Sequence, residues 1–181
     1  MYREFLILSR GGQGGVTASR ILATAAVYEG KWAQAIPEFG AERRGAIVRS
    51  YLRVSNGLIK RHSRVYNAYG ASIFSSKILE LIDISEFVPR DAILLVNSPS
   101  KPELEGYKEV NYVDATKIAL EHELVIAGWP VVNTAMASAM ARVFDIASLD
   151  NVVKAIEDFF HGELGERNVS AAREAWNKVK R

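Results

Sequence analysis

The sequence predicts an α/β fold in which a sheet carries helices on both faces and contains an inserted antiparallel hairpin. Three observations lead to this prediction. Apolar strand-like runs alternate with helical patterns along most of the 181-residue chain. The first strand leads directly through a glycine-rich turn into a helix, and one central stretch alternates apolar and polar side chains. We therefore expect a Rossmann-like, three-layer arrangement, and the length fits one domain over residues 1–181.

The first three elements form a strand, a helix and a second strand. Glu4–Leu8 is a nearly continuous apolar run, as expected for a strand buried on both faces. Thr17–Glu29 follows with apolar residues on one helical face, and Gly30 is positioned to end that helix. Trp32–Ile36 reads as the second strand, which Pro37 ends.

The central stretch predicts the antiparallel hairpin. Ile47–Val54 alternates between two faces, with Arg49, Tyr51 and Arg53 on one of them. Asn56-Gly57 is a strong signal for a type I′ turn, after which Leu58–Ser63 is expected to return as the second arm.

The remaining elements continue the alternation. Short strands are expected at Ser72–Phe74, Ala92–Val96 and Val110–Val113. Asp114 is placed to cap a helix over Ala115–Glu121, and Asn133 to cap a helix of small residues that reaches Phe144. Two amphipathic helices, Leu149–Phe160 and Ser170–Lys180, are expected to end the chain.

Composition excludes several classes of function. The chain has no cysteine, so it forms no disulfide, performs no thiol catalysis and cannot itself supply thiolates to an iron–sulfur cluster. A net charge of +2 does not suggest a nucleic-acid partner. No apolar run approaches the roughly 20 residues of a membrane helix, and a strand begins within three residues of the start. We expect a cytoplasmic protein without a signal peptide or a membrane partner.

The glycine turn is the first candidate site. Gly11, Gly12, Gln13 and Gly14 precede the helix that contains Thr17, so free backbone N–H groups and the helix dipole can face a bound anion. The alternative is a tight strand–helix connection that binds nothing. The dinucleotide pattern G-x-G-x-x-G is not met, and no Lys-Ser/Thr pair follows as in a P-loop.

The segment from Glu38 to Arg44 is the second candidate. Glu38 lies near the position of a ribose-binding acid, about 20 residues after the turn. Arg43 and Arg44 can each bind a phosphate or a carboxylate in a forked geometry. The alternative is an exposed cluster of ion pairs with little effect on stability.

The third candidate is Asn133, at the start of the helix of small residues. It would bring a polar group near the carboxyl ends of the strands, where open α/β sheets bind ligands. Close helix packing alone also explains the small residues. His62, His122 and His161 are widely separated in the sequence, and we expect neither a metal site nor a catalytic residue in this chain.

Taken together, these motifs resemble one family over essentially the whole chain. They are Gly11–Gly14 followed by Val16-Thr17, then Glu42–Ala46, Val113–Thr116 and Asn133–Met136. Their order and spacing are similar to those of the gamma subunits of 2-oxoacid:ferredoxin oxidoreductases, especially the pyruvate type. The chain departs from the family pattern at three positions. Ser9 stands where a glycine is expected, Gly15 where valine is commoner, and Ile47 where many relatives have proline.

The resemblance implies a cytoplasmic complex, for example a heterotetramer, with alpha, beta and delta subunits and with ferredoxin as electron acceptor. Such a complex decarboxylates a 2-oxoacid with thiamine diphosphate and Mg²⁺, transfers electrons through [4Fe–4S] clusters and delivers the acyl group to coenzyme A. This chain alone is expected to be inactive and to bind no metal.

The resemblance also suggests a role for the candidate site residues. They would contact coenzyme A or a facing subunit, and they are Gly11, Gly12, Gln13, Gly14, Thr17, Glu38, Arg43, Arg44 and Asn133.

Two other functions remain open from the residues alone. One is a free-standing nucleotide-binding protein or NAD(P)-dependent oxidoreductase, which the glycine turn favours and the incomplete fingerprint disfavours. The other is a scaffold or regulatory domain that keeps the fold without the complex.

Overall fold

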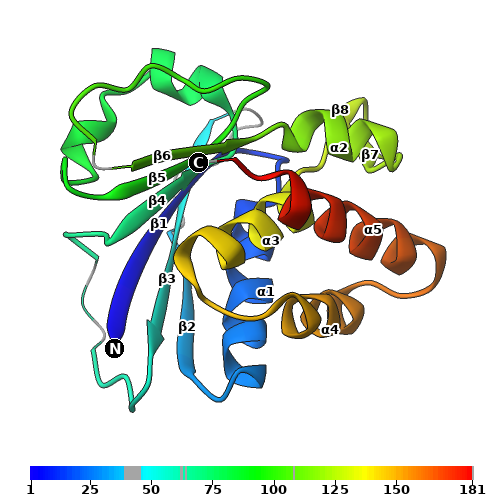
Figure 1. The fold of residues 1–181 in the computed structure, drawn as a ribbon, viewed down its shortest axis with the longest axis horizontal. Helices are drawn as coiled ribbons and strands as arrows, with labels where there is room; N and C mark the ends of the chain where they lie inside the picture. Colours follow the sequence, from blue (N-terminus) through cyan, green and yellow to red (C-terminus); the bar gives the residue numbers. More distant parts are fainter. Residues whose placement is uncertain (39–45, 62, 64, 108, 181) are drawn as a thin grey trace.

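The computed structural model describes residues 1–38, 46–61, 63, 65–107 and 109–180. Within them, a six-stranded mixed sheet has the order β2-β3-β1-β4-β5-β6, and a separate pair, β7-β8, is antiparallel (Figure 1). The strands are β1 (Tyr2–Arg10), β2 (Trp32–Pro37), β3 (Ile47–Ser55), β4 (Gly70–Ile73), β5 (Ile93–Asn97), β6 (Glu109–Val113), β7 (Val125–Ile126) and β8 (Trp129–Pro130).

The helices cover the two faces of the sheet differently. On one face, α1 and α3 pack against the sheet while α4 and α5 form a layer outside them (Figure 1). The other face is covered by the short 3-10 helices η1 and η2 and by extended segments. The helices are α1 (Gly15–Tyr28), η1 (Ser76–Glu80), η2 (Ile84–Glu86), α2 (Ala115–Glu121), α3 (Asn133–Phe144), α4 (Leu149–Phe159) and α5 (Gly162–Lys178). The predicted α/β class is confirmed, with 3-10 helices rather than α-helices on the second face.

β1 is the central strand and the point where the direction of the sheet changes. It pairs in parallel with β4, and β4, β5 and β6 continue in parallel. On its other side β1 pairs antiparallel with β3. The carboxyl ends of β1, β4, β5 and β6 therefore share one edge of the sheet, which is where open α/β folds bind ligands.

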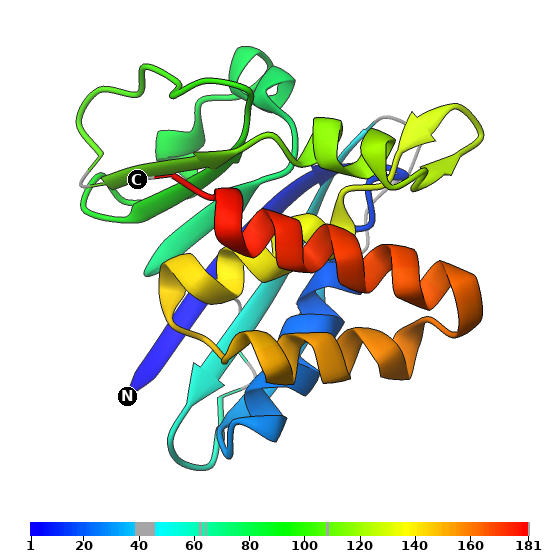
Figure 2. The ribbon, with the colours of Figure 1, turned by 45° about the vertical axis from the view of Figure 1, so that its right-hand side comes forward.

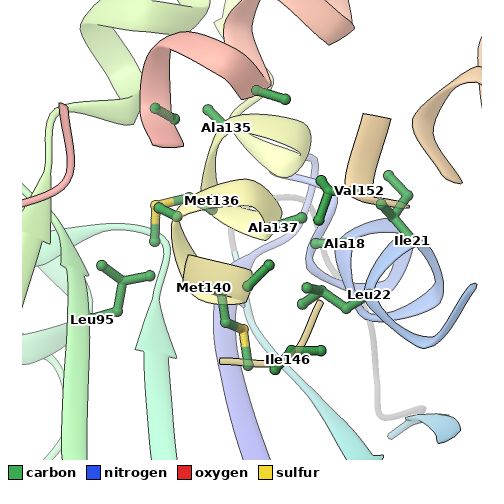
Figure 3. Close-up of a cluster of buried hydrophobic side chains, with 14 of the residues drawn as sticks. Ala18, Ile21, Leu22, Leu95, Ala135, Met136, Ala137, Met140, Ile146 and Val152 are labelled. Carbon is green, nitrogen blue, oxygen red and sulfur yellow. The ribbon is translucent and has the colours of Figure 1, made fainter. Parts of the chain in front are cut away.

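The core explains the small-residue helix. α3 is buried between the sheet and the outer helices, and Ala137 and Met140 have no exposed surface. In Figure 3, Met136 points toward Leu95 of the sheet and Ala137 lies toward Ala18 of α1. Alanines let α3 approach α1 closely, while the flexible methionines fill the space above the sheet.

The predicted return arm of the hairpin is wrong. β3 pairs with β1 on one side and with β2 on the other, so neither of its edges is free for Leu58–Ser63. The described residues of that segment form no strand. The buried Arg53 guanidinium instead donates hydrogen bonds to the Arg61 carbonyl, at 2.9 Å, and to the Ser63 carbonyl. Glu4 pairs with the same guanidinium, at 2.8 Å from Nε.

Helix starts were predicted with mixed success. Asp114 caps α2 as expected, since its carboxylate accepts a hydrogen bond from the Lys117 amide at 2.9 Å. Asn133 is not the cap of α3; Val132 occupies that position, and Asn133 is the first helical residue. α5 begins at Gly162, before the expected Ser170.

Candidate functional site

A cleft of about 500 Å³ opens at the carboxyl end of β1. The glycine turn forms its floor together with the start of α3, and the β7-β8 hairpin lies beside the turn (Figure 2). The lining residues are Ser9, Arg10, Gly11, Gly12, Gly14, Gly15, Val16, Thr17, Val48, Glu123, Leu124, Val125, Ile126, Val131, Asn133, Phe159, Phe160, Leu164 and Asn168.

The turn needs glycine where it meets α3. Gly14 has φ of 79°, in the left-handed region that L side chains rarely adopt. A Cβ added at Gly14 would lie 2.8 Å from Cβ of Asn133. The start of α3 therefore packs directly against the turn, and this contact brings Asn133 to the cleft floor.

Two departures from the family pattern, Ser9 and Gly15, lie in contact. A Cβ added at Gly15 would lie 2.3 Å from Oγ of Ser9 and 2.8 Å from its Cβ. Both distances are shorter than the contacts that Cβ atoms make in proteins, so the Ser9 side chain would have to move. The Ser9 side chain thus occupies the space that a larger residue at position 15 would require. With a glycine at position 9 that obstruction would be removed. The two departures therefore compensate for each other.

Gln13 holds the turn in place and is not among the lining residues. Its side-chain carbonyl accepts a hydrogen bond from the Arg10 amide at 2.8 Å, and its Nε2 donates to the Phe74 carbonyl at 3.2 Å. Asn97 donates to the same carbonyl at 2.9 Å and contacts Thr116 at the start of α2. These side-chain amides connect the ends of β1, β4 and β5, so the site is held by three strands.

The start of α1 presents hydrogen-bond donors that the described chain does not use. The amides of Gly12, Gly14 and Gly15–Thr17 have no hydrogen-bond acceptor among the described residues. The N-cap residue Gly14 has no side chain to accept them, and the first turn contains no acidic residue. The partial positive charge of the helix dipole therefore faces the cleft uncompensated by an acid of the first turn.

Asn133 adds a further donor to the floor. Its residue is only 4% exposed, and its Oδ1 accepts a hydrogen bond from the Thr134 amide at 2.8 Å. This bond fixes which side-chain atom is the oxygen. Nδ2 then has no partner within the described part of the chain and is accessible from the cleft.

Asn168 of α5 fixes the neighbouring part of the cleft. It accepts a hydrogen bond from the Thr134 hydroxyl at 2.9 Å and donates to the Leu164 carbonyl at 2.8 Å. Both polar ends of Asn168 are thus engaged within the protein. The contrast identifies Asn133, and not Asn168, as the amide available to a ligand.

The opposite wall of the cleft is apolar. Phe159 and Phe160 end α4, Leu164 lies in the first turn of α5, and Val125 and Ile126 form β7. Ile126 is 68% exposed, and Leu164 is 53% exposed. At the rim, Glu123 forms an ion pair with Arg167 at 3.0 Å. Sequence reasoning missed this wall, although Val125-Ile126 and Trp129 on either side of Gly128 carried the pattern of a short hairpin.

The predicted site residues separate into three groups. Gly11, Gly12, Gly14, Thr17 and Asn133 line the cleft together. Glu38 does not line it, since its carboxylate contacts Arg49 at 3.1 Å and the Tyr51 hydroxyl at 3.0 Å. Arg43 and Arg44 lie outside the described residues.

Two kinds of feature are absent from the described residues. No three His, Cys, Asp or Glu side chains there are grouped to hold a metal ion. No helix in the same part of the chain has the length and apolar character to cross a membrane.

Comparison with known proteins identifies the family. The profile described as "Pyruvate ferredoxin/flavodoxin oxidoreductase" matches residues 4–178. "Pyruvate synthase subunit PorC" of Methanothermobacter marburgensis is 40% identical over 177 residues, which cover 98% of this chain and 97% of that protein. The "Pyruvate/ketoisovalerate oxidoreductases common subunit gamma" of Pyrococcus furiosus is 41% identical over 94% of this chain and 93% of its own length.

A solved structure agrees in both sequence and fold. The crystal structure of pyruvate oxidoreductase subunit PORC from Thermotoga maritima superposes with a TM-score of 0.81 at 34% identity. The match covers 99% of this chain and 97% of that one. The free-standing nucleotide-binding alternative is not favoured by these matches. The chain belongs to the pyruvate ferredoxin/flavodoxin oxidoreductase family, as one of its gamma subunits.

Proposed function

We propose that this chain assembles with alpha, beta and delta subunits into a pyruvate:ferredoxin oxidoreductase, and that it binds and positions without taking part in the bond-breaking steps. One observation carries the proposal. Two relatives named as pyruvate synthase subunits, from Methanothermobacter marburgensis and Methanocaldococcus jannaschii, align over 98% and 97% of this chain at 40% and 43% identity. Such an alignment leaves little of the chain for a different role.

The chemistry of the cleft supports a binding role. Glu123 is the one carboxylate in the described lining, and it is exposed and paired with Arg167. The rest of the lining offers backbone groups and amide, hydroxyl, guanidinium and apolar side chains, which can bind and orient a group but whose ordinary pKa values lie far from neutral pH. Catalytic groups are therefore expected on the partner subunits.

The cofactors of the complex fit this division of roles. Iron–sulfur clusters require thiolates, and this chain contains no cysteine, so its residues do not fit a cluster. The cleft does fit a group with hydrogen-bond acceptors, because its floor presents unpaired N–H groups. Under this proposal Gly11, Gly12, Gly14, Thr17 and Asn133 contact coenzyme A or a facing subunit, while Gln13 shapes the turn.

The segment from Glu38 to Arg44 completes the proposed contact. Glu38 is anchored to Arg49 and Tyr51 of β3, which fixes the residue at the start of the segment that carries the two arginines. Arg43 and Arg44 then contribute guanidinium groups to the same partner or to coenzyme A. Reversing the charge at both arginines is expected to raise the apparent KM for coenzyme A or to weaken assembly.

The test is an anaerobic affinity purification of the tagged chain from its native cells. The eluate is assayed for coenzyme A-dependent viologen reduction with pyruvate, 2-oxoglutarate, branched-chain oxoacids and aryl pyruvates. Co-elution of cluster-containing subunits with activity strongest on pyruvate supports the proposal. A chain that elutes alone and inactive, from cells whose lysate has the activity, overturns it. Untagged cells provide the control for carry-over.

A further inference from the structure

We propose that the cleft receives a segment of a partner subunit that carries a carboxylate flanked by apolar side chains. The carboxylate accepts hydrogen bonds from the start of α1 and from Asn133, and the apolar side chains pack on β7 and the wall opposite the turn. This inference rests on the proposed function, because it requires a partner subunit, and it chooses that partner over coenzyme A as occupant.

The floor selects for an anionic oxygen. Donors without an acceptor among the described residues converge there: the amides of Gly12 and Gly14, the first-turn amides of α1 and Nδ2 of Asn133. Convergent N–H groups at a helix start bind carboxylate or phosphate oxygens, and the helix dipole adds to the attraction.

Asn133 is evidence independent of the helix start. A residue that is 4% exposed normally has both ends of its amide bonded, as Asn168 beside it does. Asn133 leaves Nδ2 unpaired within the described residues, on the side that faces the cleft. An acceptor from outside this chain would complete its hydrogen bonding.

The wall selects for a peptide. Val125, Ile126 and Leu164 present apolar surface at the cleft, and Trp129, which is 53% exposed, pairs with Ile126 across the β7-β8 hairpin. Contiguous exposed apolar surface of this kind marks a protein interaction site. Alternate side chains of an extended segment would place one side against this wall while the carboxylate reaches the floor.

The charge of the described lining, which does not include Arg43 and Arg44, favours the peptide over coenzyme A. The diphosphate and 3′-phosphate of coenzyme A carry several negative charges. In the described lining Arg10 is the one cation, and it already takes part in another interaction. Glu123 at the rim adds a negative charge. A single carboxylate matches the neutral donors of the floor better than three phosphates do.

The test measures assembly of the full complex with matched variants of the tagged chain. Asn133→Asp places a negative charge on the floor, and Ile126→Ser removes apolar surface at the rim. Asn56→Asp and Leu81→Ser are the controls, since both residues are exposed and lie outside the cleft; Leu81 is 61% exposed. We expect each cleft variant to weaken assembly about tenfold or more and each control less than about twofold. Circular dichroism of each variant checks the fold.

Photo-crosslinking from position 126 in the wild-type complex identifies the occupant. A cross-linked partner peptide that contains Asp, Glu or a chain terminus beside apolar residues supports the inference. An intact, active complex with no cross-linked partner, or with normal assembly of both cleft variants and a raised KM for coenzyme A, overturns it in favour of the coenzyme. If wild-type chain fails to co-purify with partners at all, the proposed function fails first, and this inference with it.

Discussion

The starts of α1 and α4 show how differently one chain treats two helix N-termini. α4 is closed by its own chain: the Glu29 carboxylate accepts hydrogen bonds from the Ser148 amide at 2.9 Å and from its hydroxyl at 3.0 Å. Asp150 adds a negative charge in the first turn. α1 has glycine at its cap, no acid in its first turn and no described acceptor for its first amides. The comparison suggests that α1 is left open for an acceptor from another molecule.

The largest expected effect on stability comes from a substitution at the start of α1. Gly15→Ala should destabilise the chain by about 1–3 kcal/mol, because the new Cβ would lie 2.3 Å from Oγ of Ser9. In the Ser9→Gly background the same change should cost little or even stabilise, since alanine is the better helix residue. Urea unfolding of the wild type, the two single variants and the double variant gives the coupling free energy between positions 9 and 15. Equal costs of Gly15→Ala in both backgrounds would show that the two positions are independent.

A smaller effect on stability is expected at the start of α4, where Glu29 accepts hydrogen bonds. Glu29→Gln should lower stability by about 0.5–1 kcal/mol near neutral pH, because α4 loses a charged acceptor at its first turn. Thermal unfolding at several pH values measures it. Glu86→Gln, at the 3-10 helix η2, provides a comparison outside the α4 start.

The same carboxylate predicts a pH dependence. The hydrogen bonds from the Ser148 backbone and the Asn151 side chain hold the pKa of Glu29 below its ordinary value of 4.5. A pKa that is lower in the folded chain gives stability that is present above the unfolded pKa and is lost as pH falls through the folded one. Wild-type chain should therefore lose more stability on acidification below about pH 4.5 than Glu29→Gln does. Parallel acid profiles would contradict the assignment.

The smallest effect on stability should have the opposite sign. Thr17→Asp supplies α1 with an acid in its first turn, as Asp150 does for α4, and should stabilise the isolated chain by about 0.3–1 kcal/mol. The same carboxylate should compete with an incoming anion, so assembly should weaken while stability rises. Unfolding of the free chain and co-purification with its partners provide the two measurements. A variant that is less stable and assembles normally would contradict an open, anion-accepting start.

Local patterns predicted the elements well and their partners less well. The order strand, glycine turn, helix and strand was visible because burial fixes the periodicity of β1 and α1. Alternation in β3 shows that its two faces differ, but it does not specify which strands pair with it. The sequence therefore could not exclude Leu58–Ser63 as a partner. The two-residue strands β7 and β8 are too short to show a periodicity, so Gly128 between apolar residues was the signal available for this hairpin.

Some of the residues that line the cleft were predicted from the sequence. One of them, Asn133, was predicted for a reason that differs from its role in the structure. The glycines were found because only glycine adopts positive φ easily. Asn133 was chosen as a helix cap, whereas its structural importance is an amide held against Gly14 with one end unpaired. Gln13 was expected to bind a ligand, but its contact with Phe74 is long-range and has no local signature. The compensation between Ser9 and Gly15 likewise appears only when both are placed in space.

The most direct measurement is hydrogen exchange by mass spectrometry on the free chain and on the purified complex. If α1 is completed by a partner, peptides covering residues 12–17 should exchange about tenfold or more slowly in the complex. Peptides covering the α4 start at 148–151, where the Ser148 and Asn151 amides already have acceptors within the chain, should change far less. Unchanged exchange at 12–17 in an intact complex, or equal protection at both starts, would contradict the difference between the two helix starts.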